Sequence, residues 1–515
     1  MIFAVAMTFI DQTIVSIAIP EVQKDLGLSS TGVQWVINGY LLSLSALFAF
    51  GGRLADIAGH RRMVVIGVVI FATASALCGA TPTGDAAEAW IIVFRIIQGA
   101  GAALMFPAAL AIVIGAFPVN ERGKAMAIFF AVAGGLTSVG PIAGGYLTEI
   151  DWRAIFWVNI PVALIALLLT WRAKPANEPR PAPIDYRGTL LICGGMGLAV
   201  LGLQQSATWG WGSVATWGCI VVGLALLAAF VVNQLRVANP LIRVRIFQDR
   251  AFAMENVVLF LLMIPFIPLF FFASVYSQVS LDYDASNAGL YLLIFFAGFA
   301  VASQIGGRIL DARGARPSVV LGCAVAAVGF ALWAHQLPDL ELNSQWPWIV
   351  LTGAGIGLIL GPANTDAINR APRTSYGEAT GITQTVRNFG SSLGLAVMGS
   401  VLILQNKANI EDSFDQLGIS RDKADAVADS LSQGGSGTGA VAESLGGKAR
   451  DAFAQVPHDY ALASRTVFYI MAGVMALAFV VSLLGLPAGK VADKAEADPG
   501  DDEAPGETPA AAPAS

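Results

Sequence analysis

The feature of this chain that most constrains its fold is a series of apolar stretches, each about 20 residues long. A helix of about 20 mostly apolar residues can cross the hydrocarbon core of a membrane. There are fourteen such stretches: 1–20, 33–52, 63–81, 89–107, 124–147, 153–171, 188–205, 214–235, 252–273, 287–306, 317–335, 346–363, 379–404 and 464–486. The sequence therefore predicts an all-α polytopic membrane protein with fourteen transmembrane (TM) helices.

The composition argues against other classes of protein. Charged residues make up 13% of the 515 residues, about half of the roughly 25% typical of soluble chains. The four cysteines lie in apolar stretches without a CxxC pair, and the three histidines are far apart in the sequence. We therefore expect the lipid bilayer as a partner, and no metal site, no cofactor and no nucleic acid.

The two ends of the chain differ in character. Met1–Pro20 lacks the basic start and the small-residue cleavage site of a signal peptide, and it contains Asp11, so we expect a mature helix. Residues 487–515 are rich in Ala, Pro and acidic residues. Such a composition cannot bury enough apolar surface to fold, which predicts a disordered acidic tail.

Basic residues predict the orientation in the membrane. They concentrate in alternate loops, beginning with Arg53, Arg61 and Arg62, whereas several of the intervening short loops have none. Loops rich in Lys and Arg remain on the cytoplasmic side. We therefore expect a protein of the inner (plasma) membrane with both termini in the cytoplasm. The segment 405–463 is then an extracellular loop, with possible short helices near 421–431 and 441–455.

An internal repeat divides the chain. GRLADIAGHR begins at Gly52, and GRILDARGAR begins at Gly307. Gly-Ala-Gly follows each copy at a nearly constant offset, at 99–101 and at 353–355. A duplicated helical unit in parallel orientation is typical of transporters with two related halves. The expected division is therefore 1–171 (a six-helix bundle), 172–250 (two inserted helices with linkers), 251–486 (a second six-helix bundle with the 405–463 loop) and the 487–515 tail.

The loop Gly51–Arg62, GGRLADIAGHRR, resembles the cytoplasmic loop signature of the major facilitator superfamily. The resemblance implies a major facilitator fold that works by alternating access, with the loop stabilising one gating state. Glycines permit a tight turn between two helices, and Asp56 can cap a helix and pair with a nearby Arg. The implied gating-loop residues of the two copies are Gly52, Asp56, Gly59, Arg61, Arg62, Gly307, Asp311, Gly314 and Arg316.

The stretch 124–147 contains a second motif that resembles this superfamily. GPIAGG, at 140–145, is similar to the GPxxGG pattern of its antiporters. Proline removes a backbone donor and bends a helix, and glycines allow neighbouring helices to pack closely. The resemblance implies an antiporter kink at Gly140, Pro141, Gly144 and Gly145; a plain packing kink is the alternative.

Two charged residues lie inside apolar stretches. IDQTIVSIAIP, which begins at Ile10, is similar to the first-helix segment of the fourteen-helix drug:proton antiporter family, and FRIIQGAGAA, which begins at Phe94, resembles the RxxQG segment of the superfamily. Buried charges in a bilayer are costly and need partners. The resemblance implies that Asp11 exchanges protons and that Arg95 assists it; Asp11 as an interfacial packing residue is the alternative.

Further segments resemble the same subfamily. They are Trp152–Pro161, Asn239–Phe252 and Gly377–Gly394. The stretches 287–306 and 379–404 contain no Asp or Glu, and the second contains Arg387. This argues against dicationic substrates and mildly favours neutral or anionic ones. The residues expected to line a substrate cavity are Thr13, Gln98, Gln304, Gln384, Arg387 and Asn388.

A cluster of phenylalanines has two possible roles. Its members, Phe260, Phe266, Phe270, Phe271, Phe272, Phe295 and Phe296, form either a hydrophobic substrate wall or ordinary helix packing.

Several functions remain open. We expect a proton-coupled exporter of drugs or small hydrophobic compounds that works as a monomer. The alternative is a dedicated exporter of one endogenous metabolite, such as a siderophore, pigment, antibiotic or lipid precursor. A membrane enzyme would need a cluster of reactive residues, and the sequence shows no such cluster and no HExxH motif. Gly485–Val491 lacks the spacing of an ATP-binding P-loop, and a passive channel needs no gating repeat.

Overall fold

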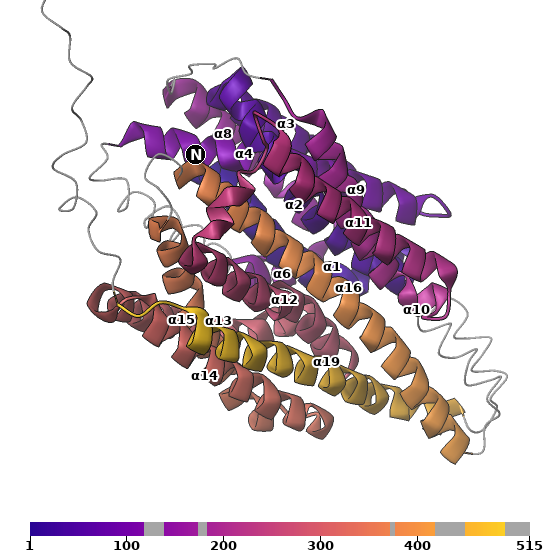
Figure 1. The fold of residues 1–515 in the computed structure, drawn as a ribbon. Helices are drawn as coiled ribbons and strands as arrows, with labels where there is room; N and C mark the ends of the chain where they lie inside the picture. Colours follow the sequence, from indigo (N-terminus) through magenta and orange to yellow (C-terminus); the bar gives the residue numbers. More distant parts are fainter. Residues whose placement is uncertain (118–138, 174–182, 371–375, 418–448, 490–515) are drawn as a thin grey trace, which may run out of the picture.

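The first half of the chain forms one helix bundle (Figure 1). The computed structural model describes residues 1–117, 139–173, 183–370, 376–417 and 449–489. The helices of the N-terminal half are α1 (Ile2–Leu26), α2 (Ser30–Ala58), α3 (His60–Gly79), α4 (Ala87–Ala116), α6 (Val139–Ile150), α7 (Ala154–Trp157) and α8 (Asn159–Ala173).

A hairpin and a second bundle follow. The hairpin consists of α9 (Tyr186–Gln204), the short α10 (Ser206–Trp209) and α11 (Val214–Arg236), and the 3₁₀ helix η1 (Val244–Gln248) comes next. The helices of the C-terminal half are α12 (Arg250–Val279), α13 (Ala285–Arg313), α14 (Ala315–Gln336), the 3₁₀ helix η2 (Leu337–Asp339), α15 (Leu342–Arg370), α16 (Tyr376–Gln416) and α19 (Ala449–Gly485). No strand occurs in the described ranges.

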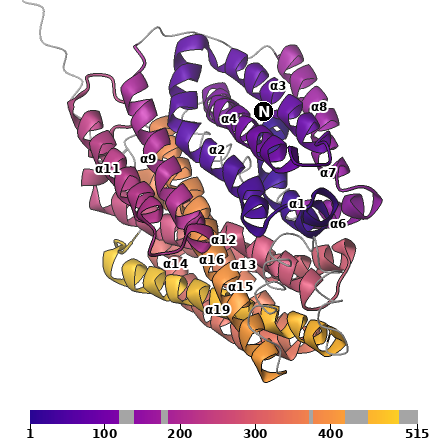
Figure 2. The same cartoon turned by 90° about the vertical axis from the view of Figure 1, so that its right-hand side faces the viewer.

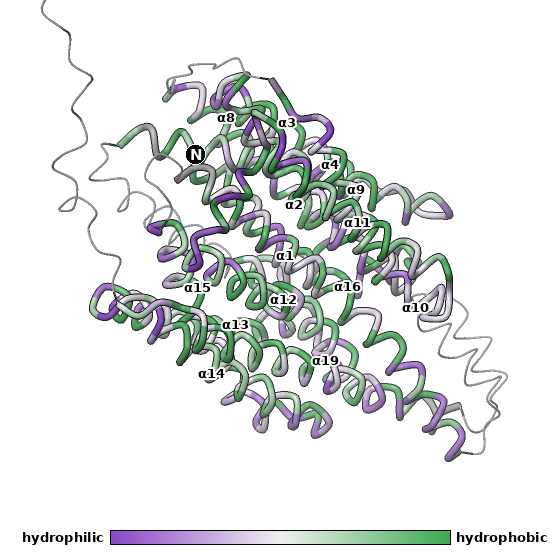
Figure 3. Tube along the Cα trace, in the orientation of Figure 1, coloured by the Kyte–Doolittle hydropathy of each residue, from purple (hydrophilic) through white to green (hydrophobic). Residues whose placement is uncertain are grey.

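The helices confirm the predicted fold class. Thirteen helices among the described residues are long and apolar enough to cross a membrane. The remaining predicted span, 124–147, lies partly outside the described residues, and its described end belongs to α6. Hydrophobic residues dominate the middle of the helices, and hydrophilic residues lie mostly near their ends (Figure 3). Large apolar side chains such as Leu164, Leu190 and Val214 are exposed, as expected for surfaces that face lipid.

Helix packing repeats between the two halves. In the N-terminal half α4 packs against α2 and α3, and in the C-terminal half α15 packs against α13 and α14. The repeated Gly-Ala-Gly segment lies at these helix crossings. A side chain at Gly99 would overlap the Tyr40 carbonyl of α2, and one at Gly353 would overlap the Phe295 carbonyl of α13. Small residues let membrane helices approach this closely.

Among the described residues, the two halves meet mainly where α1 packs against α12, α2 against α16, and α6 against α13. Figure 2 shows the two bundles on opposite sides of this junction. Gln278 Nε2 donates to the Ile17 carbonyl oxygen at 3.0 Å, and Ser45 Oγ donates to the Thr385 carbonyl oxygen at 3.0 Å. The inserted α9 packs against α11, α2 and α16, so the hairpin lies beside the junction.

The expected loop 405–463 needs correction. Its first part continues α16 as far as Gln416, and its last part belongs to α19, which begins at Ala449. Hydropathy marks where a helix leaves the membrane, whereas polar residues can continue the helix in water. The expected short helix at 421–431 and the tail from 490 onward lie outside the described residues.

Candidate functional site

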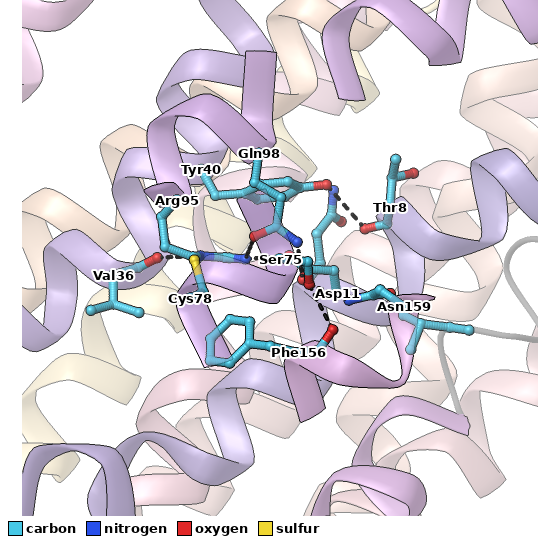
Figure 4. A network of polar contacts seen from close by, with 12 residues as sticks. Thr8, Asp11, Val36, Tyr40, Ser75, Cys78, Arg95, Gln98, Phe156 and Asn159 are labelled. Atoms are coloured by element: carbon cyan, nitrogen blue, oxygen red, sulfur yellow. Dashed lines mark hydrogen bonds and ion pairs between the residues drawn. The ribbon is translucent and has the colours of Figure 1, made fainter. Parts of the chain in front are cut away.

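Asp11 lies in a polar network inside the N-terminal half (Figure 4). Arg95 Nη1 donates to Asp11 Oδ2 at 2.6 Å, and Gln98 Nε2 donates to Asp11 Oδ1 at 2.9 Å. Arg95 Nη1 also donates to Gln98 Oε1 at 2.7 Å. The Asp11 and Arg95 side chains are 0% and 1% exposed. The network is therefore a fully buried ion pair with a shared amide partner.

Arg95 has further partners that do not depend on Asp11. Its Nε donates to the Val36 carbonyl oxygen at 2.7 Å. Its Cζ lies 4.5 Å from the centre of the Tyr40 ring and 5.9 Å from that of the Phe156 ring. A buried charge is tolerated when it is paired and hydrogen-bonded, and aromatic faces attract a guanidinium. These contacts hold Arg95 in place whether Asp11 carries a proton or not.

A second set of hydrogen bonds fixes Phe156 beside Arg95. Ser75 Oγ of α3 donates to the Phe156 carbonyl oxygen at 2.8 Å, and Asn159 Nδ2 of α8 donates to Ser75 Oγ at 3.0 Å. Phe156 and Asn159 belong to Trp152–Pro161, a segment that sequence resemblance singled out without a role. The structure shows that this segment anchors α7 and α8 to α3 beside the buried pair.

Helix geometry brings the network together. Arg95 and Gln98 are three residues apart on α4, so their side chains project from the same face, and that face meets α1 at Asp11. The sequence predicted that Arg95 needs a buried partner, and the structure identifies this partner as Asp11. Proton exchange at Asp11 stays a prediction.

A small cavity lies between the two halves. Its described lining comes from α1, α2, α4, α12, α13, α15 and α16, and includes Phe9, Gln12, Leu44, Phe106, Met263, Phe266, Ile267, Phe296, Phe299, Leu360, Gln384, Arg387 and Asn388. Its volume is about 50 Å³, whereas pockets for drug-sized ligands measure roughly 300–1,000 Å³. The cavity in this structure is therefore too small for such a ligand. Phe9 and Gln12 line the cavity and flank Asp11 in the sequence.

The predicted cavity residues divide into two groups. Gln384, Arg387 and Asn388 line the cavity. Thr13 instead packs against Gly140 of α6, Gln98 belongs to the Asp11 network, and Gln304 is exposed. These last three lie outside the described lining of this cavity, so their role in a substrate cavity stays a prediction.

Arg387 gives the cavity its charge. Its Nη1 donates to Gln384 Oε1 at 2.5 Å and lies 3.5 Å from Asn364 Oδ1, and its buried Nε has no hydrogen-bond partner among the described residues. No described carboxylate forms an ion pair with it. Arg387 is also the only ionisable side chain in the described lining. The cavity therefore presents a positive charge with unused hydrogen-bonding capacity.

The phenylalanine cluster lies partly in the cavity lining and partly in the helix packing, and its role as a substrate wall stays a prediction. Phe266 and Phe296 line the cavity, together with Phe299, which the sequence did not single out. Phe270 and Phe295 are buried behind them, with 5.4 Å between the ring centres of Phe270 and Phe296. One side of the cavity is therefore a stacked aromatic wall.

The two gating loops have the same backbone form. Gly59 separates α2 from α3 with φ 98°, and Gly314 separates α13 from α14 with φ 86°. Because glycine adopts positive φ readily, each helix pair turns at a single residue. Asp56 therefore remains inside α2 and does not cap α3. Its Oδ1 lies 3.7 Å from His60 Nε2, a contact that becomes an ion pair when His60 is protonated.

The second gating loop, around Gly314, makes different contacts from the first. Asp311 is exposed, and Arg316 Nη2 donates to the Leu483 carbonyl oxygen of α19 at 2.8 Å. The first copy has Gly52 beside Pro107 of α4. The latch role that the resemblance implies for both loops stays a prediction.

The GPxxGG motif lies at the junction of the halves. A side chain at Gly144 would meet the Ile14 carbonyl of α1, and one at Gly145 would meet the Ala285 carbonyl of α13. Gly289 of α13 in turn packs against the Pro141 carbonyl. The motif therefore brings α6 close to both halves. The expected kink at Pro141 stays a prediction, because residues 118–138 are outside the described part.

Two of the buried acids that escaped the sequence analysis lie close together in the C-terminal half. Glu255 of α12 is 0% exposed and Asp366 of α15 is 2% exposed. Arg370 Nε donates to Asp366 Oδ2 at 2.5 Å. Glu255 lies inside the predicted span 252–273, so the same reasoning that selected Asp11 could have found it. Asp366 lies three residues beyond a predicted span boundary, and hydropathy alone gives it no signal.

Comparisons with known proteins agree on one family. The model of the family described as the Major Facilitator Superfamily matches residues 1–395. The chain is 37% identical to the puromycin resistance protein pur8 of Streptomyces alboniger, over 77% of this chain and 79% of that protein. It is 31% identical to the tetracenomycin C resistance and export protein of Streptomyces glaucescens, over 92% and 88% of the two chains.

Solved structures share the fold. An inward-facing, unoccupied bacterial homologue of the human lysosomal transporter Spinster superposes with a TM-score of 0.61 at 17% identity, over 93% of this chain and 95% of that chain. A D-xylose–proton symporter gives a TM-score of 0.56 at 14% identity, over 94% and 96%. At these identities the likeness shows the fold alone.

The buried pair predicts a coupled effect on stability. R95M leaves the Asp11 carboxylate buried without its cation, which costs about 3–5 kcal/mol. D11N/R95M removes both charges, so we expect it to be more stable than R95M. Thermal unfolding of the purified protein in detergent, followed by tryptophan fluorescence, measures the difference.

The control is R153M, which breaks the partly exposed pair of Arg153 with Asp25, 3.0 Å apart. A pair this exposed contributes about 1 kcal/mol or less, so the expected shift is small. Strictly additive effects of D11N and R95M would contradict an energetic coupling between the two residues.

Proposed function

The chain belongs to the major facilitator superfamily, and from this premise we propose that it exports drugs or other small hydrophobic compounds in exchange for protons. It is a membrane transporter, not an enzyme, and its relatives include drug and antibiotic export proteins. The relatives support export, while the coupling to protons rests on the Asp11–Arg95 network. This network is the single observation that carries the proposal.

Asp11 is suited to exchange a proton because its partner keeps neutral hydrogen-bond and aromatic contacts when the ion pair is lost. When Asp11 takes up a proton, the ion pair with Arg95 is lost, but Gln98, the Val36 carbonyl and the Tyr40 ring continue to hold the guanidinium. The change alters the attraction between α1 and α4. Phe9 and Gln12, on either side of Asp11, line the central cavity, so α1 can link proton binding to the shape of the substrate site.

The second part of the proposal is alternating access, in which the two halves open the central cavity to one side of the membrane at a time. The described parts of the two halves contact each other mainly through α1 and α12, α2 and α16, and α6 and α13, with close glycine contacts at α6 and α13. The cavity between them is too small for a drug. We propose that the halves rock about this junction, and that the loops at Asp56 and Asp311 stabilise different states. The loop at 53–62 then faces the cytoplasm of a cell whose plasma membrane holds the protein.

The coupling is tested with D11N. We expect cells that express D11N to lose efflux of ethidium driven by the proton gradient, because asparagine cannot take up and release the proton. The wild-type protein should lose efflux to the same level when a protonophore is added. D415N makes the same change at an exposed position of α16 and should export normally. Full gradient-driven efflux by D11N would contradict the assignment.

The substrate charge is tested separately, because Arg387 favours an anionic or neutral compound. The paired probes are ethidium, a cation, and anilinonaphthalene sulfonate, an anion of similar aromatic character. A hydrogen bond to a charged group contributes about 1.5–3 kcal/mol. We therefore expect R387Q to weaken binding of the sulfonate to the purified protein by roughly 10–100-fold, and R387K to weaken it less.

The control for this experiment is R236Q, at an exposed arginine of α11, which should bind the sulfonate as the wild-type protein does. Ethidium binding that falls as much as sulfonate binding in R387Q would contradict a charge-selective role. Failure of the wild-type protein to export either dye, with the fold intact, would favour the dedicated exporter of one endogenous metabolite.

A further inference from the structure

A second buried carboxyl site lies in the C-terminal half. Glu255 of α12 is completely buried, and neither of its carboxyl oxygens has a hydrogen-bond donor among the described residues. An ionised carboxylate in such a place would be unpaired, which is costly in a protein interior. The charged groups that interact with it are Asp366 and Arg370 of α15.

If both acids were ionised, the three side chains together would carry one unbalanced negative charge. Asp366 is ion-paired with Arg370 at 2.5 Å, and this pair is neutral. The Glu255 carboxyl interacts with the Asp366 carboxyl, and two carboxyl groups can hydrogen-bond only when one of them carries a proton. Like charges at close range do not both ionise in an apolar site. One bound proton makes the group of three neutral and supplies the missing hydrogen bond.

The other helices around Glu255 add no compensating charge. On α14 the Cys323 thiol lies within electrostatic range of Glu255, and Ser482 of α19 contacts that thiol. Among the described residues, no basic group of α13, α16 or α19 forms an ion pair with Glu255 or Asp366. Among the described groups, a bound proton is therefore the positive charge that would balance the second carboxylate.

The site is separate from Asp11 and from the cavity. Glu255 is five residues into α12, which begins at Arg250, and Asp366 is four residues before the end of α15. At 1.5 Å per residue, both lie roughly 6–8 Å from the helix ends. These ends share the face that carries the Gly314 turn, the side that basic residues predict to be cytoplasmic. Neither acid lines the cavity.

We propose that Glu255 and Asp366 share one proton and form a second proton-binding site, which exchanges this proton with the cytoplasm during transport. The exchange step rests on the proposed proton coupling, whereas the bound proton does not. Movement of α15 relative to α12 would separate the two carboxyl groups and release the proton. The C-terminal half would then take part in coupling alongside Asp11 of the N-terminal half.

Infrared difference spectroscopy of the purified full-length protein in lipid tests the bound proton directly. At neutral pH we expect a carbonyl band of a protonated carboxyl group that E255Q removes and D366N shifts. The band should persist in D11N and in E341Q, which makes the same change at an exposed glutamate. A spectrum that E255Q leaves unchanged, or a band abolished when sodium chloride replaces choline chloride, would overturn the assignment of a proton.

The exchange is tested with the dye that the wild-type protein exports, ethidium or the sulfonate. In proteoliposomes E255Q should lower the ratio of protons to dye by one, and an unchanged ratio would overturn the coupling role of this site. If efflux proves independent of the proton gradient in the wild-type protein, the proposed function fails. The infrared band still decides whether Glu255 carries a proton.

Discussion

The ion pair between Asp11 and Arg95 is the interaction on which the N-terminal half depends. A charge in the interior of a membrane protein is tolerated only with partners, and here each member of the pair is hydrogen-bonded as well as paired. The requirement fixes more than two residues. It determines which faces of α1 and α4 meet, and the separate hydrogen bonds of Ser75 and Asn159 hold Phe156 beside Arg95.

Close helix packing is the second constraint, and it operates in both halves. Gly99 and Gly353 bring α4 and α15 against their neighbours at equivalent points of the repeat, and Gly145 and Gly289 do the same where α6 meets α13. A rigid bundle on each side of a narrow junction can rock without rebuilding its interior. The buried acids lie within these bundles, so a change of charge there acts on helix packing before it reaches the cavity.

Much of this architecture could be predicted from the sequence, because each level leaves a local signal. Apolar stretches mark spans, and the repeated glycine and acidic residues mark the two halves. Burial of Arg95 required a partner, which proved to be Asp11. Other features leave no such signal. The direction in which Thr13 or Gln304 points depends on which helix lies opposite, and the continuation of α16 beyond its apolar stretch depends on helix formation outside the membrane. Glu255 was visible as an acid in an apolar stretch, but its meaning depends on Asp366, more than 100 residues away.

The most direct measurement of proton-coupled export uses purified protein in liposomes with a gradient of exported dye and no pH gradient. A pH indicator trapped inside the liposomes reports proton movement while the dye flows. The account predicts that protons move against the dye and that the internal pH changes only when the protein is present. Dye transport without a pH change would contradict it, and would leave the buried pair of Asp11 and Arg95 a purely structural feature.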